Sequence, residues 1–201
     1  MADKGTLTDA FIEKLREAYD TERQLKKGLK RLGKAAHAPA LRAAFEAHLE
    51  ETRGHETRLE EAFGLLDTKV RPRRCEGIAG ILEEAKAVTK RDLDEATMDA
   101  CLIAVAQSAE HYEIAAYGTL VAWARRLEQE DVTDLLVKIL EEEKAVDETL
   151  SMLAEDEGVN QAAVEADDDE RVDHDDEETP TRKAKATLGG KSLVRKRRPR
   201  R

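Results

Sequence analysis

The chain is predicted to be an all-α protein, and two observations favour this class. Its 201 residues are dominated by Ala, Leu, Glu, Lys and Arg, whereas Pro (4) and Gly (11) are few. Apolar residues recur every three or four positions over long stretches, which is typical of helices with one buried face. With 40% hydrophobic and 39% charged residues, the chain can bury one core of ordinary size beneath a heavily solvated surface.

The first half of the chain predicts a helical hairpin. The first helix begins near Thr6 or Thr8, either of which suits a helix N-cap, and its apolar spacing continues to Gly33. A second helical pattern runs from Leu41 to Leu66. Because the connection between them is short, the two helices are expected to pack side by side and antiparallel.

A different texture follows at residues 67–77, which contain Pro72, a basic cluster and Gly77. Residues 78–88 then form a shorter amphipathic pattern. We interpret the whole segment as a long crossover that carries its own short helix.

The third and fourth long helices are predicted at roughly residues 94–127 and 130–155, with only a few residues between them. They form a second antiparallel hairpin. Two antiparallel hairpins joined by a long crossover with a short extra helix is the layout of a ferritin-like four-helix bundle. This bundle is expected to occupy residues 1–160.

Residues 161–201 are predicted to be a disordered tail with two oppositely charged blocks. Residues 165–178 hold ten acidic residues and one basic residue, whereas residues 181–201 hold ten basic residues and no acidic residue. The formal charge divides into about −11 for residues 1–164, −9 for the acidic block and +10 for the basic block. Only the basic block is therefore expected to bind polyanions.

The expected location is the cytoplasm. The N-terminal residues lack the cationic and apolar regions of a signal peptide, and no apolar run approaches the length of a membrane span, so no membrane partner is expected. The two cysteines, Cys75 and Cys101, are too few for a disulfide framework and lack CxxC spacing, which fits a reducing compartment and excludes a site made of cysteines alone.

Acidic and histidine side chains interrupt the apolar face of every long helix. Several ionised carboxylates that point towards one core need a common counter-charge, and a pair of metal ions would supply it. The two hairpins also repeat the arrangement. The second helix of each hairpin contains a pair of candidates one helical turn apart, Glu51 with His55 and Glu143 with Asp147. The candidate metal ligands are Glu22, Glu51, His55, Glu110, Glu113, Glu143 and Asp147.

Oxygen-rich ligation with one or two imidazoles suits iron or manganese, and we favour two iron ions, with manganese as the alternative. Each candidate has a less specific interpretation. A single Glu in helices this charged is also typical of a solvated face or a salt bridge one turn away, and His55 beside Arg53 and Glu56 is either a ligand or a surface residue. His48 and His111 are interpreted as outer or surface groups, and Tyr19, Tyr112 and Tyr117 as neighbours of the centre.

Three segments resemble the YciE/YciF family of ferritin-like bacterial stress proteins. They are AHLEETRGHETRLEEAF, AVAQSAEHYEIAAYGTLVAWA and LEEEKAVDETLSMLA, and the resemblance covers about residues 6–155. It implies a ferritin-like bundle, a homodimer, a role in stress responses and a di-metal centre on the bundle axis. The acid–histidine spacing departs from the Glu-x-x-His pairs of many di-iron proteins, because the pairs here are four residues apart.

Two classes of function follow. In the first, the protein is a metal-dependent redox protein with ferroxidase or peroxide-reducing activity, and oxygen or peroxide is its small-molecule substrate. In the second, it is a non-catalytic structural stress protein whose basic tail binds nucleic acid without sequence specificity or a protein partner. The segment ATLGGKSLVRKR also has a fainter similarity to the C-terminal peptides that load cargo into encapsulin shells.

Overall fold

A computed structural model describes residues 5–155 and 158–166 of the chain. Within these residues the regular structure is helical: four long helices, one short helix, and short helical turns at residues 159–166. The helices are α1 (Leu7–Ala35), α2 (Pro39–Leu65), α3 (Glu76–Val88), α4 (Glu95–Arg126) and α5 (Glu130–Glu155). These bounds lie close to those that the periodicity predicts.

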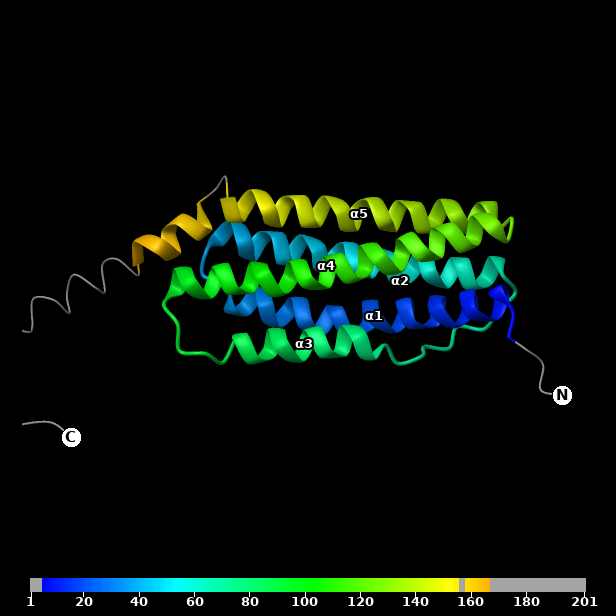
Figure 1. Cartoon of the computed structure of the whole chain (residues 1–201), viewed down its shortest axis with the longest axis horizontal. Coiled ribbons are helices and arrows are strands. Elements are labelled where there is room, and N and C mark those ends of the chain that lie inside the picture. Colours follow the sequence, from blue (N-terminus) through cyan, green and yellow to red (C-terminus); the bar gives the residue numbers. More distant parts are fainter. Residues whose placement is uncertain (1–4, 156–157, 167–201) are drawn as a thin grey trace, which may run out of the picture.

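The long helices form a four-helix bundle (Figure 1). The hairpin α1–α2 packs beside the hairpin α4–α5, with further contacts between α2 and α5 and between α1 and α4. The crossover returns along the bundle, so α2 and α4 run in the same direction, and its short helix α3 lies against α1 and α4. The predicted all-α bundle of two antiparallel hairpins with a crossover helix is confirmed.

Local signals explain where the helices begin. Thr6 forms a capping box with Asp9 at the start of α1, and Asp94 accepts a hydrogen bond from the backbone N–H of Thr97 at the start of α4. Helix α2 has no side-chain cap of its own. Instead Asp99 of α4 accepts hydrogen bonds from the backbone N–H groups of His37 (2.8 Å) and Ala38 (2.6 Å), which ties the two hairpins together.

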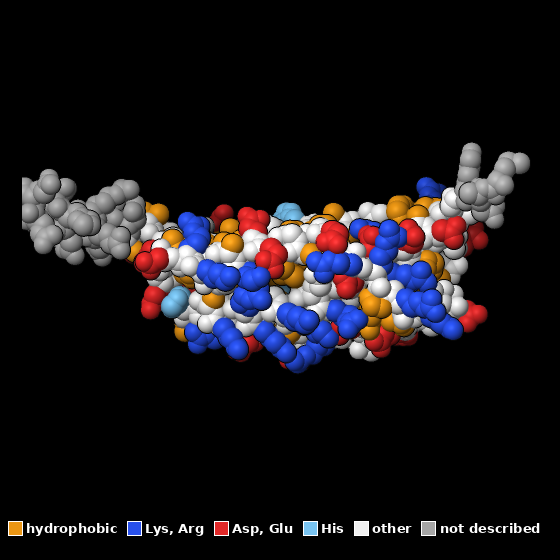
Figure 2. All heavy atoms as spheres, turned by 90° about the horizontal axis from the view of Figure 1, so that it is seen from below, with side chains coloured by type: hydrophobic (Ala, Val, Ile, Leu, Met, Phe, Trp, Pro, Cys, Tyr) orange, Lys and Arg blue, Asp and Glu red, His pale blue; other side chains and the backbone are white. Residues whose placement is uncertain are grey.

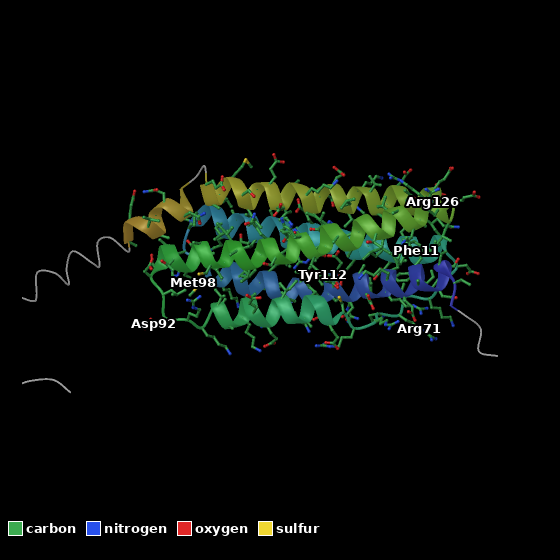
Figure 3. All side chains as sticks on the ribbon, viewed as in Figure 1. Phe11, Arg71, Asp92, Met98, Tyr112 and Arg126 are labelled. Carbon is green, nitrogen blue, oxygen red and sulfur yellow. The ribbon has the colours of Figure 1, made fainter. Side chains whose placement is uncertain are left out.

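Apolar residues form separate clusters at the two ends of the bundle. One end contains Phe45, Leu102 and Leu150, and the other contains Phe11, Phe63 and Leu136. Met98 and Phe11 mark these ends in Figure 3. A smaller third cluster lies under α3. The middle of the bundle is therefore left to other side chains.

The short helix α3 approaches α4 closely because Gly77 has no side chain. A Cβ atom at this position would lie 2.6 Å from the Tyr112 ring. The Tyr112 hydroxyl lies 2.9 Å from the buried Cys75 Sγ. The short helix α3 thus covers the face of the bundle formed by α1 and α4.

The surface is densely charged, and many Lys and Arg side chains lie on the face that Figure 2 shows. Lys27, Arg31 and Arg74 line a pocket between α1 and α3. Of the described helices, none combines the length and the apolarity needed to span a bilayer. The predicted tail begins at residue 161. Its residues 161–166 are helical, and its remaining residues lie outside those that the structure describes.

Candidate metal centre

Six titratable side chains are buried together between the two apolar end clusters. All four long helices contribute, and none of the six residues is more than 2% exposed. The residues are Glu22 of α1, His48 and His55 of α2, Glu110 and Glu113 of α4, and Glu143 of α5.

Helical spacing turns these residues inward. In α2 the buried positions step by three or four through Phe45, His48, Thr52, His55 and Leu59, which is the spacing of one helix face. The same holds for Glu22 in α1, which is three residues before the buried Leu25. The helix face that carries the apolar core residues therefore also points these titratable side chains towards the bundle interior.

One group of donors surrounds His48. Its members are His48, Glu110, Glu113 and Glu143, and each offers one nitrogen or oxygen atom within 4.8 Å of those of the others. The His48 Nε2 atom lies 3.3 Å from Glu110 Oε1 and 3.8 Å from Glu143 Oε2.

A second group surrounds His55 and consists of His55, Glu22 and Glu143. The His55 Nδ1 atom lies 3.0 Å from Glu143 Oε1 and 3.4 Å from Glu22 Oε2. The two imidazole ring centres are 6.5 Å apart. Glu143 belongs to both groups and faces each histidine with a different oxygen, so its carboxylate connects the two groups.

The centre is unusual in its hydrogen bonding. Among the described residues, ten buried side-chain nitrogen or oxygen atoms lack a hydrogen-bond partner, and nine of them belong to the six residues of this centre. Both oxygens of Glu113 and both oxygens of Glu143 are among them. Buried polar atoms are normally paired, so such a concentration indicates atoms held ready for another partner.

The electrostatics agree with this interpretation. Burial raises the pKa of Glu113 well above its usual value, and the nearby carboxylates of Glu143, Glu22 and Glu110 raise it further. Burial likewise raises the pKa of Glu22 and of Glu143, although His55 opposes the effect in both. Four carboxylates in one buried place repel one another, and a cation is the partner that would relieve this repulsion.

Burial lowers the pKa of each buried histidine, but the surrounding carboxylates outweigh this effect. They raise the pKa of His48 well above its usual value, chiefly through Glu110. Glu143 and Glu22 raise the pKa of His55 to about 10. In the absence of metal, the histidines therefore act as the positive partners of the carboxylates.

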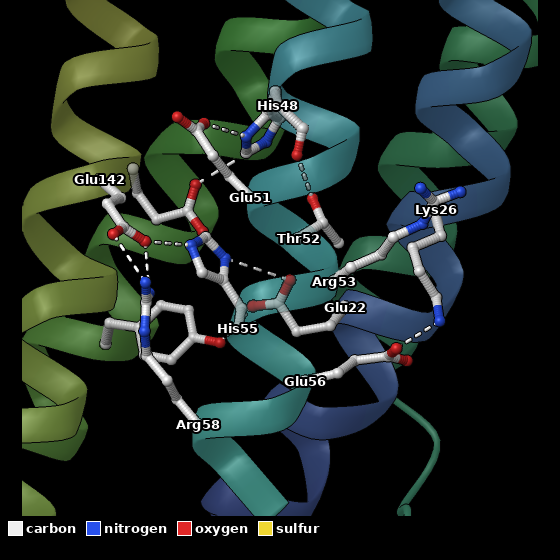
Figure 4. A network of polar contacts seen from close by, with 12 residues as sticks. Glu22, Lys26, His48, Glu51, Thr52, Arg53, His55, Glu56, Arg58 and Glu142 are labelled. Atoms are coloured by element: carbon white, nitrogen blue, oxygen red, sulfur yellow. Dashed lines mark hydrogen bonds and ion pairs between the residues drawn. The ribbon is translucent and has the colours of Figure 1, made fainter.

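Each histidine also contacts an outer carboxylate with its other ring nitrogen (Figure 4). His55 Nε2 lies 2.8 Å from Glu142 Oε2, and Glu142 is held in turn by two hydrogen bonds from Arg58, one of them 2.8 Å long. His48 Nδ1 lies 3.5 Å from Glu51 Oε2. Metal-binding histidines commonly have such carboxylate partners, which fix the ring orientation.

A buried tyrosine completes the surroundings. The hydroxyl of Tyr117 donates a hydrogen bond to Glu22 Oε1, and neither residue is more than 1% exposed. Burial raises the pKa of Tyr117 well above its usual value, and the neighbouring carboxylates add to this effect. Tyr117 therefore stays a neutral donor that orients Glu22.

The donor set fits a pair of hard or borderline metal ions. It offers four carboxylates and two imidazoles and no thiolate, which suits iron or manganese. With two divalent ions, the four positive charges would balance the four carboxylate charges.

The structure brings together five of the seven residues that the sequence singled out: Glu22, His55, Glu110, Glu113 and Glu143. Glu51 and Asp147 lie in neither group. The side chain of Glu51 is 43% exposed at the outer side of His48, and Asp147 Oδ2 lies 3.2 Å from His111 Nε2.

His48 was interpreted from the sequence as an outer or surface group, yet it is 2% exposed and its Nε2 faces the centre. The signal that could have placed it is the spacing from His55. Seven residues correspond to two helical turns, which puts both histidines on one face of α2.

The fold and the site together define an all-α four-helix bundle with a buried carboxylate–histidine cluster between its hairpins. Residues 6–164 match the family described as Domain of unknown function (DUF892), and the chain belongs to this family. Protein YciF of Escherichia coli (strain K12) is 41% identical over 136 residues, which are 67% of this chain and 82% of that protein. The resemblance to the YciE/YciF family is confirmed.

Solved structures agree. The crystal structure of the E. coli stress protein YciF matches with a TM-score of 0.73 and 40% identity, covering 75% of this chain and 96% of that chain. YcfI from Rhodopseudomonas palustris matches with the same TM-score and coverages at 37% identity. A protein from Xanthomonas campestris matches with a TM-score of 0.63 over 82% of this chain, but its 21% identity supports the fold alone.

Proposed function

We propose that this protein is a ferritin-like, cytoplasmic stress-response protein that binds two iron ions, or alternatively two manganese ions, and reacts with oxygen or peroxide. The observation that carries the proposal is the set of nine unpaired buried donor atoms contributed by four helices. When bound, a pair of Fe²⁺ ions would supply the two electrons that convert hydrogen peroxide and two protons into two water molecules.

The residues of the chain have distinct roles in this proposal. His48 and Glu110 would hold one ion, and His55 and Glu22 would hold the other. Glu143 would serve both, because its oxygens face both histidines. Glu113, whose carboxylate interacts electrostatically with those of Glu143, Glu22 and Glu110, would supply the fourth negative charge.

The outer residues keep the donors in place. Glu142 and Arg58 orient His55 so that its Nδ1 faces the centre, and Tyr117 orients Glu22. The surrounding apolar residues exclude water, which strengthens the attraction between the carboxylates and the ions.

Anaerobic titration with Fe²⁺, followed by metal analysis, tests the proposal. The wild-type chain is expected to bind two ions, and Glu143→Gln is expected to bind fewer ions or to bind them at least tenfold more weakly. Asp147→Asn is the matched control, because it removes a carboxylate charge four residues further along α5 without touching either group. Failure of the wild-type chain to bind iron and manganese would refute the metal centre.

Peroxide then separates the two classes of function. Ferrous protein that gains the absorbance of ferric iron within the mixing time, with one peroxide used for two ions, supports the redox role. The R. palustris relative carries a name that suggests a structural role, and a stable metal complex that does not react would favour that role here.

The homodimer and the nucleic-acid contact stay predictions. Light scattering of the full chain measures the oligomeric state. Deletion of residues 165–201 is expected to abolish any retention on a DNA column and to leave iron binding unchanged.

A further inference from the structure

A pocket of about 120 Å³ lies between α2 and α5, beside the His48 half of the centre. Its lining includes Glu51, His48 and Glu110, together with the small residues Ala47 and Ala145. The Glu51 side chain is 43% exposed, whereas those of His48 and Glu110 are 2% and 1% exposed. The pocket therefore extends from the surface to the buried centre.

Metal-binding atoms follow the pocket inward. Glu51 Oε2 at the outer end lies 3.5 Å from His48 Nδ1, and His48 Nε2 lies 3.3 Å from Glu110 Oε1. Neither ring nitrogen of His48 has a hydrogen-bond partner, and the same is true of Glu110 Oε2. A cation that enters here would find a donor at each step.

Three other approaches to the centre are occupied. On the outer side of His55, Glu142 is held by Arg58, whose positive charge would repel a metal ion. Between α4 and α5, Asp147 contacts both Gln107 and His111. The short helix α3 packs against α1 and α4.

We propose that divalent metal ions enter the centre through the pocket between α2 and α5, with Glu51 as the first ligand and His48 and Glu110 as the groups that receive the ion. This inference rests on the metal centre proposed above. It gives Glu51 a role in the path of the ion rather than in the final site. After transfer, Glu51 is free to accept a hydrogen bond from His48 Nδ1, which would hold the ring in its metal-binding orientation.

The size and charge of the pocket suit this ligand. Since one water molecule occupies roughly 30 Å³, the pocket can take an ion that keeps a few of its waters. An exposed carboxylate at the mouth raises the local concentration of cations and so speeds their entry.

Loading of metal-free full-length protein with Co²⁺ tests the charge at the mouth. The visible absorbance of bound Co²⁺, followed by stopped flow, gives the association rate, and equilibrium dialysis gives the affinity. Glu51→Gln is expected to lower the association rate by about tenfold, with less than a threefold change in affinity. Glu50→Gln is the control, because it removes an exposed carboxylate at the neighbouring position of α2 that pairs with Arg53 and does not line the pocket.

A steric block tests the route independently. Ala47→Phe on α2 and Ala145→Phe on α5 each place a ring in the pocket from a different wall, and both are expected to slow loading. Ala43→Phe, at an exposed α2 position outside the pocket, should load at the wild-type rate. Circular dichroism checks that each variant is folded.

The outcomes distinguish this inference from the proposed function. Wild-type protein that binds no Co²⁺ would refute the metal centre itself. Normal binding with unchanged rates in Glu51→Gln and in both blocking variants would overturn the entry route alone. A Glu51→Gln variant that loads at the normal rate but releases Co²⁺ faster would also overturn it, because Glu51 would then be a ligand of the final site.

Discussion

Replacing Glu113 with Gln should stabilise the metal-free protein and reduce its stabilisation by metal. Glu113 is 1% exposed, and neither of its oxygens has a hydrogen-bond partner. It faces the carboxylates of Glu22, Glu110 and Glu143, which raise its pKa together with burial. A neutral amide of the same shape removes this repulsion, and its N–H groups can donate to the neighbouring carboxylates.

The magnitude follows from linkage between protonation and folding. Because the folded-state pKa of Glu113 is raised, the group favours folding below its ordinary pKa of 4.5 and loses this advantage as the pH rises towards the folded pKa. At pH 7 the loss cannot exceed about 3 kcal/mol, the free energy of protonating an ordinary carboxyl at that pH. The gain from Glu113→Gln should therefore be near zero at pH 4.5, grow as the pH rises, and stay within this limit at pH 7. A gain at the limit corresponds to a rise in Tm of about 6–12 °C.

Thermal unfolding in EDTA, followed by circular dichroism at pH 5 and pH 7, measures this difference. Glu148→Gln, at an exposed position of α5, is the control and should change the Tm little at either pH. Addition of Mn²⁺ at 100 times its Kd should stabilise the wild type by about 2.7 kcal/mol per site and the variant much less. A Glu113→Gln variant that is less stable than the wild type in EDTA at pH 7, yet equally stabilised by Mn²⁺, would refute the reasoning.

Three further substitutions separate the roles of other residues. Asp99→Ala removes the carboxylate that binds two backbone N–H groups at the start of α2, and urea denaturation should show a loss of about 2–4 kcal/mol; a loss below 0.5 kcal/mol would contradict this role. Glu142→Gln should weaken metal binding by about 10–100-fold, because Glu142 is the outer partner of His55. Glu141→Gln should leave the affinity unchanged, and equal affinities of the two variants by dialysis would contradict the role of Glu142. Phe63→Ala leaves a cavity in an apolar end cluster and should cost about 3–5 kcal/mol in the same urea assay, with metal stoichiometry unchanged.

The fold could be predicted from the sequence because apolar residues recur every three or four positions along each long helix, and the glycines within α1, α2 and α4 do not break this spacing. The boundaries were also accessible. Thr6 is a typical N-cap, and the change of texture after Leu66 marks the crossover. The cap of α2 could not be predicted, since Asp99 lies about sixty residues away in the sequence and reaches it only through tertiary packing.

The site was harder to predict in detail, because neighbouring positions on a helix differ by 100° in direction. In α2 the buried face passes through Thr52, so the adjacent Glu51 points outward. In α5 the face passes between Val146 and Asp147, and Asp147 turns towards His111. Spacing alone leaves such choices open, and the packing of the partner helices decides them.

The division of the bundle into apolar ends and a polar middle explains how the fold can hold such a centre. Four buried carboxylates destabilise the metal-free chain, as the raised pKa values of Glu22, Glu113 and Glu143 indicate. The apolar clusters at the two ends supply the packing that offsets this cost. Because the end clusters fix the four helices on both sides of the centre, its donors are held in place without an ion, so the proposed metal binding would need less ordering. It follows that substitutions at the ends should change stability without changing metal stoichiometry, whereas substitutions in the middle should change metal binding and can raise the stability of the metal-free protein.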